Sequence, residues 1–341
     1  MKARILDLTP EEYDAERGAH LTQTLATIML NRSPRHAQLA MERRGEKKRT
    51  DEMVFGSIVH ELILGRGKGF AVAEYDPEAA ATATDDETEE KPKRKGKPFV
   101  PRVGASGRPE FENWISGPAK AIKAQIEARG LVPILPKTYR IAEWLARQAR
   151  ETLSLDHEIE LGGCRSEVAV EWEEQATNGG PVTCRGQLDL WDARRARVYD
   201  LKIVHSAHPR VLDRRLLAHG DDLQATAYVR AMESVYPDLA GRIEFCFLFV
   251  EVGTGIVTPL VFDGTMRRVG ELRWRRAVDL WEQCKRVGYW PGYVTRPHVA
   301  HAPEWALAEE EAAITEAGFD ATRGASAPAD SGDKEEDDYP F

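Results

Sequence analysis

The sequence predicts an α/β fold in which a central mixed β-sheet is flanked by helices. Three observations support this. Apolar residues recur at helical spacing before residue 155, alternating strand patterns follow between 167 and 204, and a helical stretch at 216–235 precedes an apolar strand at 243–250. Helix, consecutive strands, helix and strand in this order are typical of an α/β arrangement with a buried sheet.

Length and composition indicate one elaborated domain with additions. The chain has 341 residues, more than a usual single domain, yet it has no duplicated pattern and no clean linker near its middle. Hydrophobic residues make up 42% of the chain and include eight tryptophans, enough for a sizeable core. We therefore expect a single domain over residues 1–320, containing a mobile charged insertion at 79–107, and a disordered acidic tail at 321–341.

Charge and cysteine content limit the function classes. The net charge of −9 is unfavourable for DNA binding, but much of the acidity lies in the segments 85–90 and 330–338, so the remaining chain is closer to neutral. The four cysteines form no C-x-x-C pair, which argues against zinc ribbons and iron-sulfur clusters. No apolar run approaches the ~20 residues of a membrane helix, and no signal peptide is evident at the N-terminus. We expect a cytoplasmic protein with no membrane partner.

The N-terminal part is predicted to be helical. Residues 21–44 form two short helices broken at Ser33-Pro34, because proline disfavours helix in the residue before it and is common at helix starts. Residues 51–64 form a further helix that carries His60 close to its apolar side. Helices resume at 111–128 and 139–153 after the insertion. The basic half of the insertion, 91–97, is either a DNA contact or a solvated loop.

Strand patterns follow these helices. Residues 167–173 and 182–191 alternate in polarity and are separated by a turn at Asn178-Gly179-Gly180, and a third strand spans 197–204. Between this meander and the apolar strand at 243–250, residues 216–235 read as one helix, and a last long helix runs to Val287. The strands therefore carry the chemistry described next.

Two acids and a lysine gather on the meander. Asp189 and Asp200 are eleven positions apart across a predicted hairpin, and Lys202 shares the face of Asp200 because side chains at i and i+2 lie on the same side of a strand. Glu167 can join them from the preceding strand. Carboxylates are the ligands that Mg²⁺ prefers, and open metal positions suit phosphoryl chemistry. The alternative is a turn at Asp189 and a surface ion pair between Asp200 and Lys202. Against it, Asp200 interrupts an apolar strand, where a lone carboxylate is costly.

These residues resemble the PD-(D/E)XK nuclease superfamily, with its restriction-endonuclease-like core, and within it the RecE (exodeoxyribonuclease VIII) and lambda exonuclease branch of phage recombination. The resemblance covers roughly residues 21–293 in the order of that group. The matching segments are Ser33-Pro34-Arg35-His36, Phe55-Gly56-Ser57-Ile58-Val59-His60, Gly186-Gln187-Leu188-Asp189, Asp200-Leu201-Lys202, Gln224-Ala225-Thr226-Ala227-Tyr228, Phe249-Val250-Glu251 and Trp290-Pro291-Gly292-Tyr293.

The resemblance implies a role for each site residue. His60, Asp189 and Asp200 would bind Mg²⁺ together with the backbone carbonyl of Leu201. Glu167 would serve a second metal, so that two ions occupy the site. Mn²⁺ would substitute for Mg²⁺. Lys202 would orient the attacking water, and the pair Gln224 and Tyr228 would hold water or the scissile phosphate. The middle acid is Asp189 rather than glutamate, as in other RecE-like members.

Each of these residues also has an ordinary alternative. A histidine on an apolar helix face can be a packed core residue. Glu167 can be an exposed strand residue. Tyr228 lies four positions after Gln224, a spacing also found in plain helix packing.

The resemblance also implies a function. The implied function is that of a Mg²⁺-dependent exonuclease, a phosphodiester hydrolase, which would digest double-stranded DNA in the 5′-to-3′ direction and leave 3′ overhangs for recombination and strand annealing. Such enzymes form homo-oligomeric rings, here a trimer or a tetramer, around DNA ends. The alternatives are another nuclease of the superfamily, endonucleolytic or specific for single strands, and a non-catalytic DNA-binding scaffold. Candidates for contact with a terminal 5′-phosphate are Thr22, Thr24, Arg32 and Arg35, although helix caps and surface arginines explain them equally well.

The C-terminal residues suggest a protein partner. The last five are Asp337, Asp338, Tyr339, Pro340 and Phe341, an acidic segment with a terminal apolar side chain that resembles the tip of bacterial single-stranded DNA-binding proteins. Such a segment suits a basic pocket with an apolar hole. We expect it to bind a single-strand annealing protein or a host repair protein, or to compete with DNA for the enzyme's own channel; the alternative is a solubilising tail.

Overall fold

The computed structural model describes residues 3–8, 13, 20–42, 50–67, 69–75, 102–104, 109–294 and 296–320. The chain divides into two compact units, Met1–Tyr293 and Val294–Phe341. The second unit contains the helix α11 (Glu304–Asp320). This division falls earlier than the boundary at residue 320 expected from the sequence, and the single domain over 1–320 stays a prediction. Within the described residues, no helix is long and apolar enough to cross a membrane.

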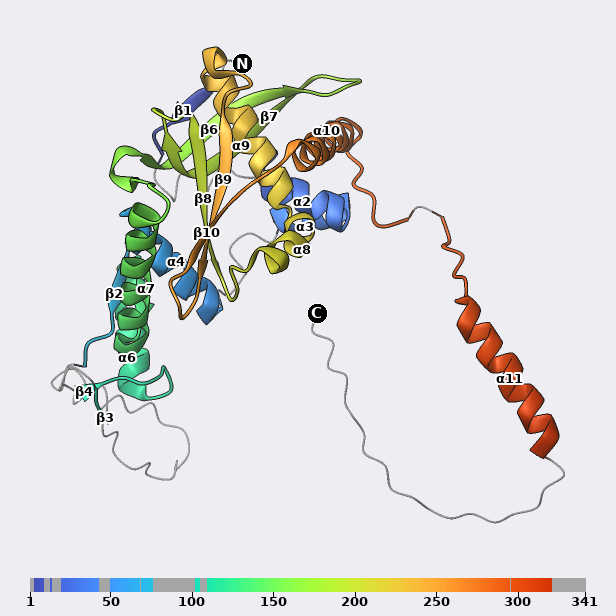
Figure 1. The fold of residues 1–341 in the computed structure, drawn as a ribbon, viewed down its shortest axis with the longest axis horizontal. Coiled ribbons are helices and arrows are strands. Elements are labelled where there is room, and N and C mark those ends of the chain that lie inside the picture. The colour runs from blue at the N-terminus through green and yellow to red at the C-terminus, as the bar shows by residue number, and fades with distance from the viewer. Residues whose placement is uncertain are drawn as a thin grey trace, which may run out of the picture. The chain divides into compact units, whose positions relative to one another are not determined.

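A six-stranded mixed sheet forms the centre of the first unit (Figure 1). Its strands, in spatial order, are β1 (Arg4–Leu6), β6 (Arg165–Gln175), β7 (Pro181–Asp192), β8 (Arg197–Val204), β9 (Glu244–Glu251) and β10 (Val257–Val261). The pair β8 and β9 is parallel and the other neighbours are antiparallel. The predicted α/β class with a central mixed sheet flanked by helices is thus confirmed, and the two edge strands β1 and β10 are additions that the sequence patterns did not reveal.

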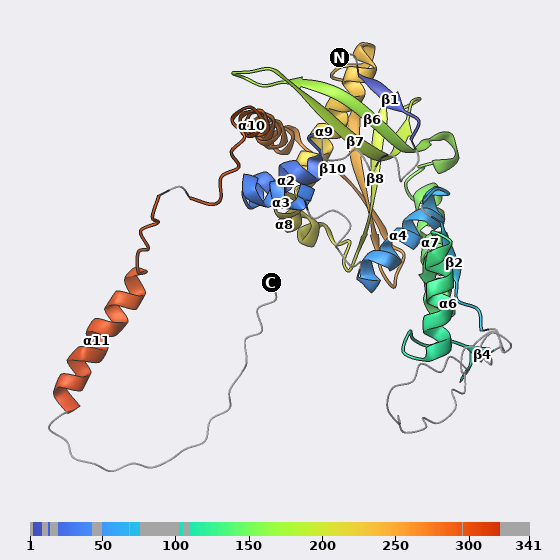
Figure 2. The same ribbon diagram turned by 180° about the vertical axis from the view of Figure 1, so that it is seen from behind.

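Helices cover both faces of this sheet (Figures 1 and 2). One side carries α2 (Gln23–Asn31), α3 (Pro34–Glu42), α8 (Pro209–His219), α9 (Asp221–Val235) and α10 (Gly264–Val287), and the other carries α4 (Asp51–Leu64) and α7 (Pro136–Leu155). The break between α2 and α3 and the bounds of α4 agree with the sequence prediction. Both faces of the sheet are therefore buried, as its apolar strands require.

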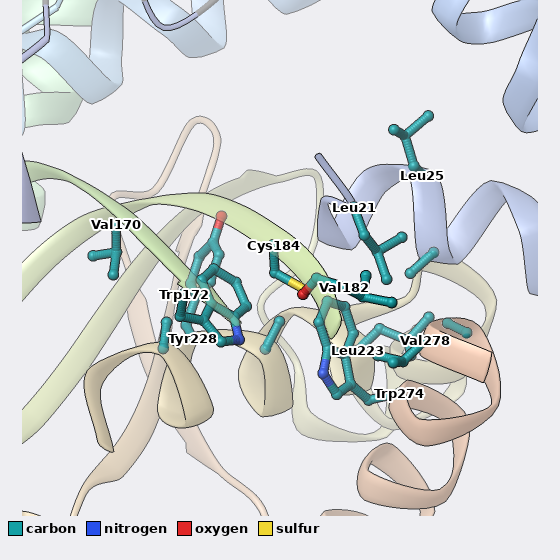
Figure 3. Packing of buried hydrophobic residues seen from close by; sticks show 14 of the residues in the cluster. Leu21, Leu25, Val170, Trp172, Val182, Cys184, Leu223, Tyr228, Trp274 and Val278 are labelled. Carbon is teal, nitrogen blue, oxygen red and sulfur yellow. The ribbon is translucent and has the colours of Figure 1, made fainter. Parts of the chain in front are cut away.

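Each face has its own core. Trp172 and Cys184 from the strands pack with Tyr228 of α9 and Trp274 of α10 in the first core cluster, as Figure 3 shows. Tyr199, Leu201 and Leu248 belong to the second, with apolar residues of α4 and α7. Burial of such a large apolar side chain contributes roughly 1.5–3 kcal/mol, which explains why these strands tolerate few polar residues.

The predicted helix over 216–235 is wrong at its N-terminal end. The chain forms two helices, α8 and α9, that meet at Gly220, where φ is +77°. A Cβ atom at this position would lie 2.2 Å from the Oγ1 atom of Thr27, and L residues rarely adopt this left-handed conformation. The turn therefore requires glycine, and it gives α9 a separate N-terminus beside the candidate site.

The described residues between α4 and α7 form a small lobe. The strands β2 (Phe70–Val72) and β5 (Val132–Ile134) pair in parallel, β3 (Arg102–Val103) pairs with β4 (Pro109–Glu110), and α6 covers Gly117–Ala128. The helix predicted from residue 111 thus begins later, because the side chain of Ser116 caps its first turn. Of the charged insertion predicted over 79–107, only residues 102–104 are described, and two of them form β3; the rest lies outside the described residues.

Candidate active site

The sheet separates between β7 and β8, and the acids predicted from the sequence lie at this fork. Pairing of β7 with β8 ends at Leu190 and Tyr199, and beyond that point β7 continues beside β6 and β8 beside β9. Asp189 and Asp200 are the next residues of the two strands. The Oδ2 atom of Asp189 accepts a hydrogen bond of 2.7 Å from the backbone N–H of Leu201, so a side chain takes the place of a ladder hydrogen bond.

The backbone is distorted on the third strand that faces this fork. Glu167 of β6 has φ +54°, although its neighbours Ser166 and Val168 pair regularly with β7. A non-glycine residue in this region costs about 1–3 kcal/mol, and such residues cluster at functional sites. On β7, opposite Glu167, Leu188 packs in the first core cluster and Leu190 in the second. Residues two apart in a regular strand share a face, so the alternation of β7 is interrupted at Asp189.

Three side chains from different elements converge here. His60 of α4 places its Nε2 atom 3.0 Å from the Oδ2 atom of Asp189 and its Nδ1 atom 3.6 Å from the Oε1 atom of Glu167. One ligand atom from each residue lies within 4.8 Å of the other two. The amide of Gln187 also donates to Glu167. An imidazole and two carboxylates at this spacing can hold a divalent cation.

A second group of polar side chains adjoins the first. Asp200 is 1% exposed, and its Oδ1 atom accepts a hydrogen bond of 2.5 Å from the amide of Gln224. The ammonium of Lys202 donates to the Oε1 atom of Gln224 at 2.8 Å and lies 2.6 Å from the Oδ2 atom of Asp200. This ion pair holds the buried Oδ2 atom of Asp200 at the fork, where a cation can take the place of the ammonium. The imidazole and carboxylates of the fork are a donor set that fits a divalent metal.

The pKa values of the acids reflect their mutual repulsion. Burial and the charge of Asp189 raise the pKa of Asp200 to about 7, and the same two causes raise the pKa of Glu167 to about 7. Although burial opposes it, the charge of His60 lowers the pKa of Asp189. Burial also favours neutral His60, but the charge of Asp189 outweighs it and raises the pKa of His60 to about 9. A bound cation offsets the repulsion between crowded carboxylates and so favours their ionised forms.

Lys202 is held as an ammonium. Burial alone would lower the pKa of Lys202, but the charges of Asp200 and Asp189 raise it. At neutral pH the side chain therefore carries a proton, and it can donate hydrogen bonds rather than act as a base. This favours the orienting role suggested by the resemblance.

Gln224 and Tyr228 reach the fork from α9. Tyr228 is buried in the first core cluster, against Gly186 of β7, where a Cβ atom would lie 2.7 Å from its ring. Burial raises the pKa of Tyr228 well above its ordinary value, so the phenol is neutral. Gly186 thus lets α9 approach β7 closely enough for Gln224 to bridge Asp200 and Lys202.

The carbonyl of Leu201 lies on the side of β8 that faces β7. In a strand, the N–H and C=O groups of one residue point toward the same edge. Because the N–H of Leu201 donates to Asp189, its carbonyl also points into the fork rather than toward β9.

The four candidates for a 5′-phosphate do not meet at one helix end. Thr22 is the buried N-cap of α2, and its hydroxyl accepts a hydrogen bond from Leu25; Thr24 accepts one from Gln23. Arg32 lies at the opposite end of α2, about 15 Å from Thr22 at 1.5 Å per residue, and exposed Arg35 contacts Gln38 on α3. The tail candidates Asp337, Asp338, Tyr339, Pro340 and Phe341 lie outside the described residues.

Several polar residues at the site were not singled out from the sequence. Gln187 lies two positions before Asp189 in the predicted strand, and this i, i+2 spacing is a signal that could have identified it. Exposed Arg66 donates to the carbonyl of Ser166, and its charge lowers the raised pKa of Glu167. Asp221 and Asp222, consecutive buried acids, begin α9. Their sequence signal was obscured because the start of α9 was hidden inside one long predicted helix.

Comparison with known proteins gives a fold similarity. No protein-family model and no curated protein matches the chain. A crystal structure of a protein from Eubacterium rectale, described as "Putative exonuclease", aligns over 87% of this chain and 96% of its own, with a TM-score of 0.51 and 11% sequence identity. A structure of SSO0001 aligns over 51% of this chain and 82% of its own, with a TM-score of only 0.24 and 15% identity. The chain therefore shares its fold with the Eubacterium rectale protein.

Proposed function

We propose that this protein is a Mg²⁺-dependent DNA nuclease of the PD-(D/E)XK type. The observation that carries the proposal is the fork of the sheet, where His60, Glu167 and Asp189 converge beside the linked side chains of Asp200, Lys202 and Gln224. Similarity in fold to the Eubacterium rectale protein supports a nuclease. A bound divalent metal would lower the pKa of water and polarise a phosphoryl oxygen.

The residues of the chain divide into two tasks. His60, Glu167 and Asp189 would hold one cation, and Asp200 with the Leu201 carbonyl would complete this set or hold a second; Mn²⁺ has the same ligand preference. Lys202, held by Gln224, presents an ammonium that orients water or a phosphate oxygen. Tyr228 keeps α9 against β7 and stays neutral.

The substrate we favour is the end of double-stranded DNA, digested 5′ to 3′ to leave a 3′ overhang for an annealing partner. The support is the ordered set of motifs between residues 21 and 293. A homo-oligomeric ring, a trimer or a tetramer, is part of the same proposal. Comparing cleavage of linear duplex, closed circular duplex and single-stranded DNA separates the exonuclease from the endonuclease and single-strand alternatives.

The direct test compares linear and covalently closed duplex DNA with Mg²⁺ and with EDTA. We expect release of nucleotides from linear duplex in Mg²⁺, none in EDTA, and none from the circle. The Asp200→Ala protein should be inactive and still bind DNA. Cutting of the closed circle would contradict exonuclease action, and full activity of Asp200→Ala would reject the site.

The 5′-phosphate contact has its own test. Replacing Arg32 and Arg35 together should erase a preference for 5′-phosphorylated ends, while Thr22→Ala, which removes a helix cap, should lower stability by about 1 kcal/mol and leave the preference unchanged. An unchanged preference in the double arginine variant would reject the assignment.

The partner proposed for the tail is tested by deletion. Removing residues 337–341 should abolish capture of a single-strand annealing or repair protein, or raise activity if the tail competes with DNA. Unchanged capture and unchanged activity would leave a solubilising role.

A further inference from the structure

The first turn of α9 contains two consecutive buried acids with different partners. Asp222 is fully buried and receives a hydrogen bond of 2.6 Å from Arg273 of α10, which in turn donates to Asn31 of α2 at 2.6 Å. Asp222 therefore joins three helices and fixes the start of α9. This structural task is complete without Asp221.

Asp221 is almost as deeply buried but has a different partner. It is 3% exposed, and its Oδ2 atom lies 3.3 Å from the Nε atom of Arg215 on α8. This ion pair links α9 to α8, as the pair of Asp222 and Arg273 links α9 to α10. What distinguishes Asp221 is therefore its position relative to the fork.

Asp221 lies on the helix face from which Gln224 reaches Lys202. Gln224, which accepts the hydrogen bond from Lys202, lies three residues later on the same helix face. Lys202 pairs in register with Phe249 of β9, and the guanidinium of Arg215, the ion-pair partner of Asp221, lies 5.2 Å from the centre of the Phe249 ring. The charge of Asp221 accordingly contributes to the raised pKa of Lys202. The charges of Asp200, Lys202, Asp221 and Arg215 thus alternate in sign.

This alternation matters for the proposed chemistry. In the structure, the ammonium of Lys202 lies against Asp200. A cation that binds Asp200 competes for that carboxylate and repels Lys202, and the neutral amide of Gln224 cannot balance the charge. Asp221 is a second anion that no proposed metal set includes.

We propose that Asp221 is a positioning residue that keeps Lys202 in the fork when a cation engages Asp200, and that Arg215 fixes Asp221 for this task. The inference rests on the proposed function for its consequence, but the geometry it concerns can be measured without cleavage of DNA.

The experiment follows the Lys202 ammonium by ¹H–¹⁵N NMR, with the resonance identified by its loss in Lys202→Arg. The full chain is studied without metal and with saturating Mg²⁺. In the native protein the ammonium signal should persist after Mg²⁺ is added. In Asp221→Asn it should broaden or disappear with Mg²⁺, because the ammonium is no longer held by a charged partner. The exposed α8 residue in Asp213→Asn provides a control with the same loss of charge.

Kinetics on linear duplex give an independent readout. Asp221→Asn should lower kcat about tenfold, since misplaced groups lose rate, and leave KM within about twofold. Asp221→Glu, which restores the charge, should recover most of the loss, and Asp213→Asn should behave as the native protein.

The outcomes separate the two proposals. A persistent Lys202 signal with Mg²⁺ in Asp221→Asn overturns the inference whether or not the protein cleaves DNA. If Asp221→Asn does not fold, Arg215→Gln, which releases Asp221 instead, should give the same loss of signal, and a normal signal there would overturn the inference. A native protein that fails to cleave DNA would reject the proposed nuclease, while the NMR comparison still decides the role of Asp221.

Discussion

Two buried carboxylates on the same sheet have opposite environments. Glu174 of β6 lies in the first core cluster and accepts hydrogen bonds from the indoles of Trp172 and Trp274 at 3.1 and 3.0 Å, and from Arg230 at 2.6 and 2.5 Å. Asp200 at the fork is equally buried but has fewer donors, the amide of Gln224 and the ammonium of Lys202, and other acids lie nearby.

The pKa values of these two residues express the difference. Although burial opposes it, the hydrogen bonds of Arg230 lower the pKa of Glu174, whereas burial raises the pKa of Asp200 to about 7. Donors that satisfy every oxygen stabilise a fold, and acids left short of donors have capacity for a ligand. Burial of a charge is thus not by itself a sign of function; the supply of donors around it separates the two regions.

The largest expected effect is on the fork. Asp200→Asn should reduce Mg²⁺-dependent hydrolysis of linear duplex at least about 1000-fold, or roughly 4 kcal/mol in activation free energy, because it removes a ligand charge. Its free energy of unfolding should fall by less than that of a Glu174 variant, because relief of the repulsion between Asp200 and Asp189 offsets the loss of the ion pair with Lys202. Nucleotide release and urea denaturation measure the two quantities. A protein that stays active, or one that loses as much stability as a Glu174 variant, would break the comparison.

The matched change in the core should act on stability. Glu174→Gln leaves Arg230 without its charged partner and should lower the free energy of unfolding by about 3–5 kcal/mol, measured by urea denaturation. The divalent-metal affinity of the folded fraction should stay within about twofold, because the described hydrogen bonds of Glu174 go to Trp172, Arg230 and Trp274, which are not candidate metal ligands. Weakened metal binding in a fully folded Glu174→Gln protein would contradict the separation of the two regions.

The two regions should also respond to pH with opposite signs. Glu167 and Asp200 have raised pKa values, so the metal-free native state retains protons that the unfolded chain releases, and the contribution of these two acids to stability falls as pH rises from about 4 to 7. The protonated form of His60 contributes fully to the free energy of unfolding below a pH of about 6.5, and this contribution is lost as pH rises through about 9. Glu174, with its lowered pKa, stabilises above pH of about 4.3 and loses this contribution as pH falls.

Comparing unfolding curves of the native protein and Asp200→Asn between pH 5 and 9 tests this sign. As pH rises, the free energy of unfolding of Asp200→Asn should increase relative to that of the native protein. Metal affinity should rise over the same range, because His60, Glu167 and Asp200 must lose protons to bind a cation, and calorimetry in buffers of different ionisation enthalpy should detect proton release. Affinity that is independent of pH would contradict the assignment of these ligands.

The smallest effect is expected at the rim of the fork. Arg66→Ala should raise the pKa of Glu167 further, since the exposed guanidinium lowers it, and should weaken divalent-metal binding at pH 7 by less than about threefold. The effect should vanish in high salt. Arg129→Ala, an exposed arginine on the α6 side of the lobe, is the control, and a tenfold loss at Arg66 would mean that its role is more than electrostatic.

Much of the fold follows from local patterns. The break at Ser33-Pro34, the helix that carries His60 and the strand at 197–204 agree with the structure, because proline geometry and apolar periodicity act within a few residues. The start of α9 does not agree with the structure. From the sequence, Gly220 looks like a tolerated helix residue, and only the packing of Thr27 against it shows that the chain turns there. The edge strands β1 and β10 are too short or too exposed for alternation to identify them.

For the candidate site, the sequence by itself determined which residues are proposed to carry the chemistry. The acids, the lysine, the histidine and the helix of Gln224 and Tyr228 are residue types at spacings that strands and helices convert into neighbours. Only the tertiary structure decided how they meet. The fork between β7 and β8, the left-handed backbone of Glu167 and the alternating charges from Asp200 to Arg215 depend on contacts between segments far apart in the chain. The physical reason is that residue type and local spacing are fixed along the chain, whereas the pKa and partners of a buried charge are set by whatever packs around it.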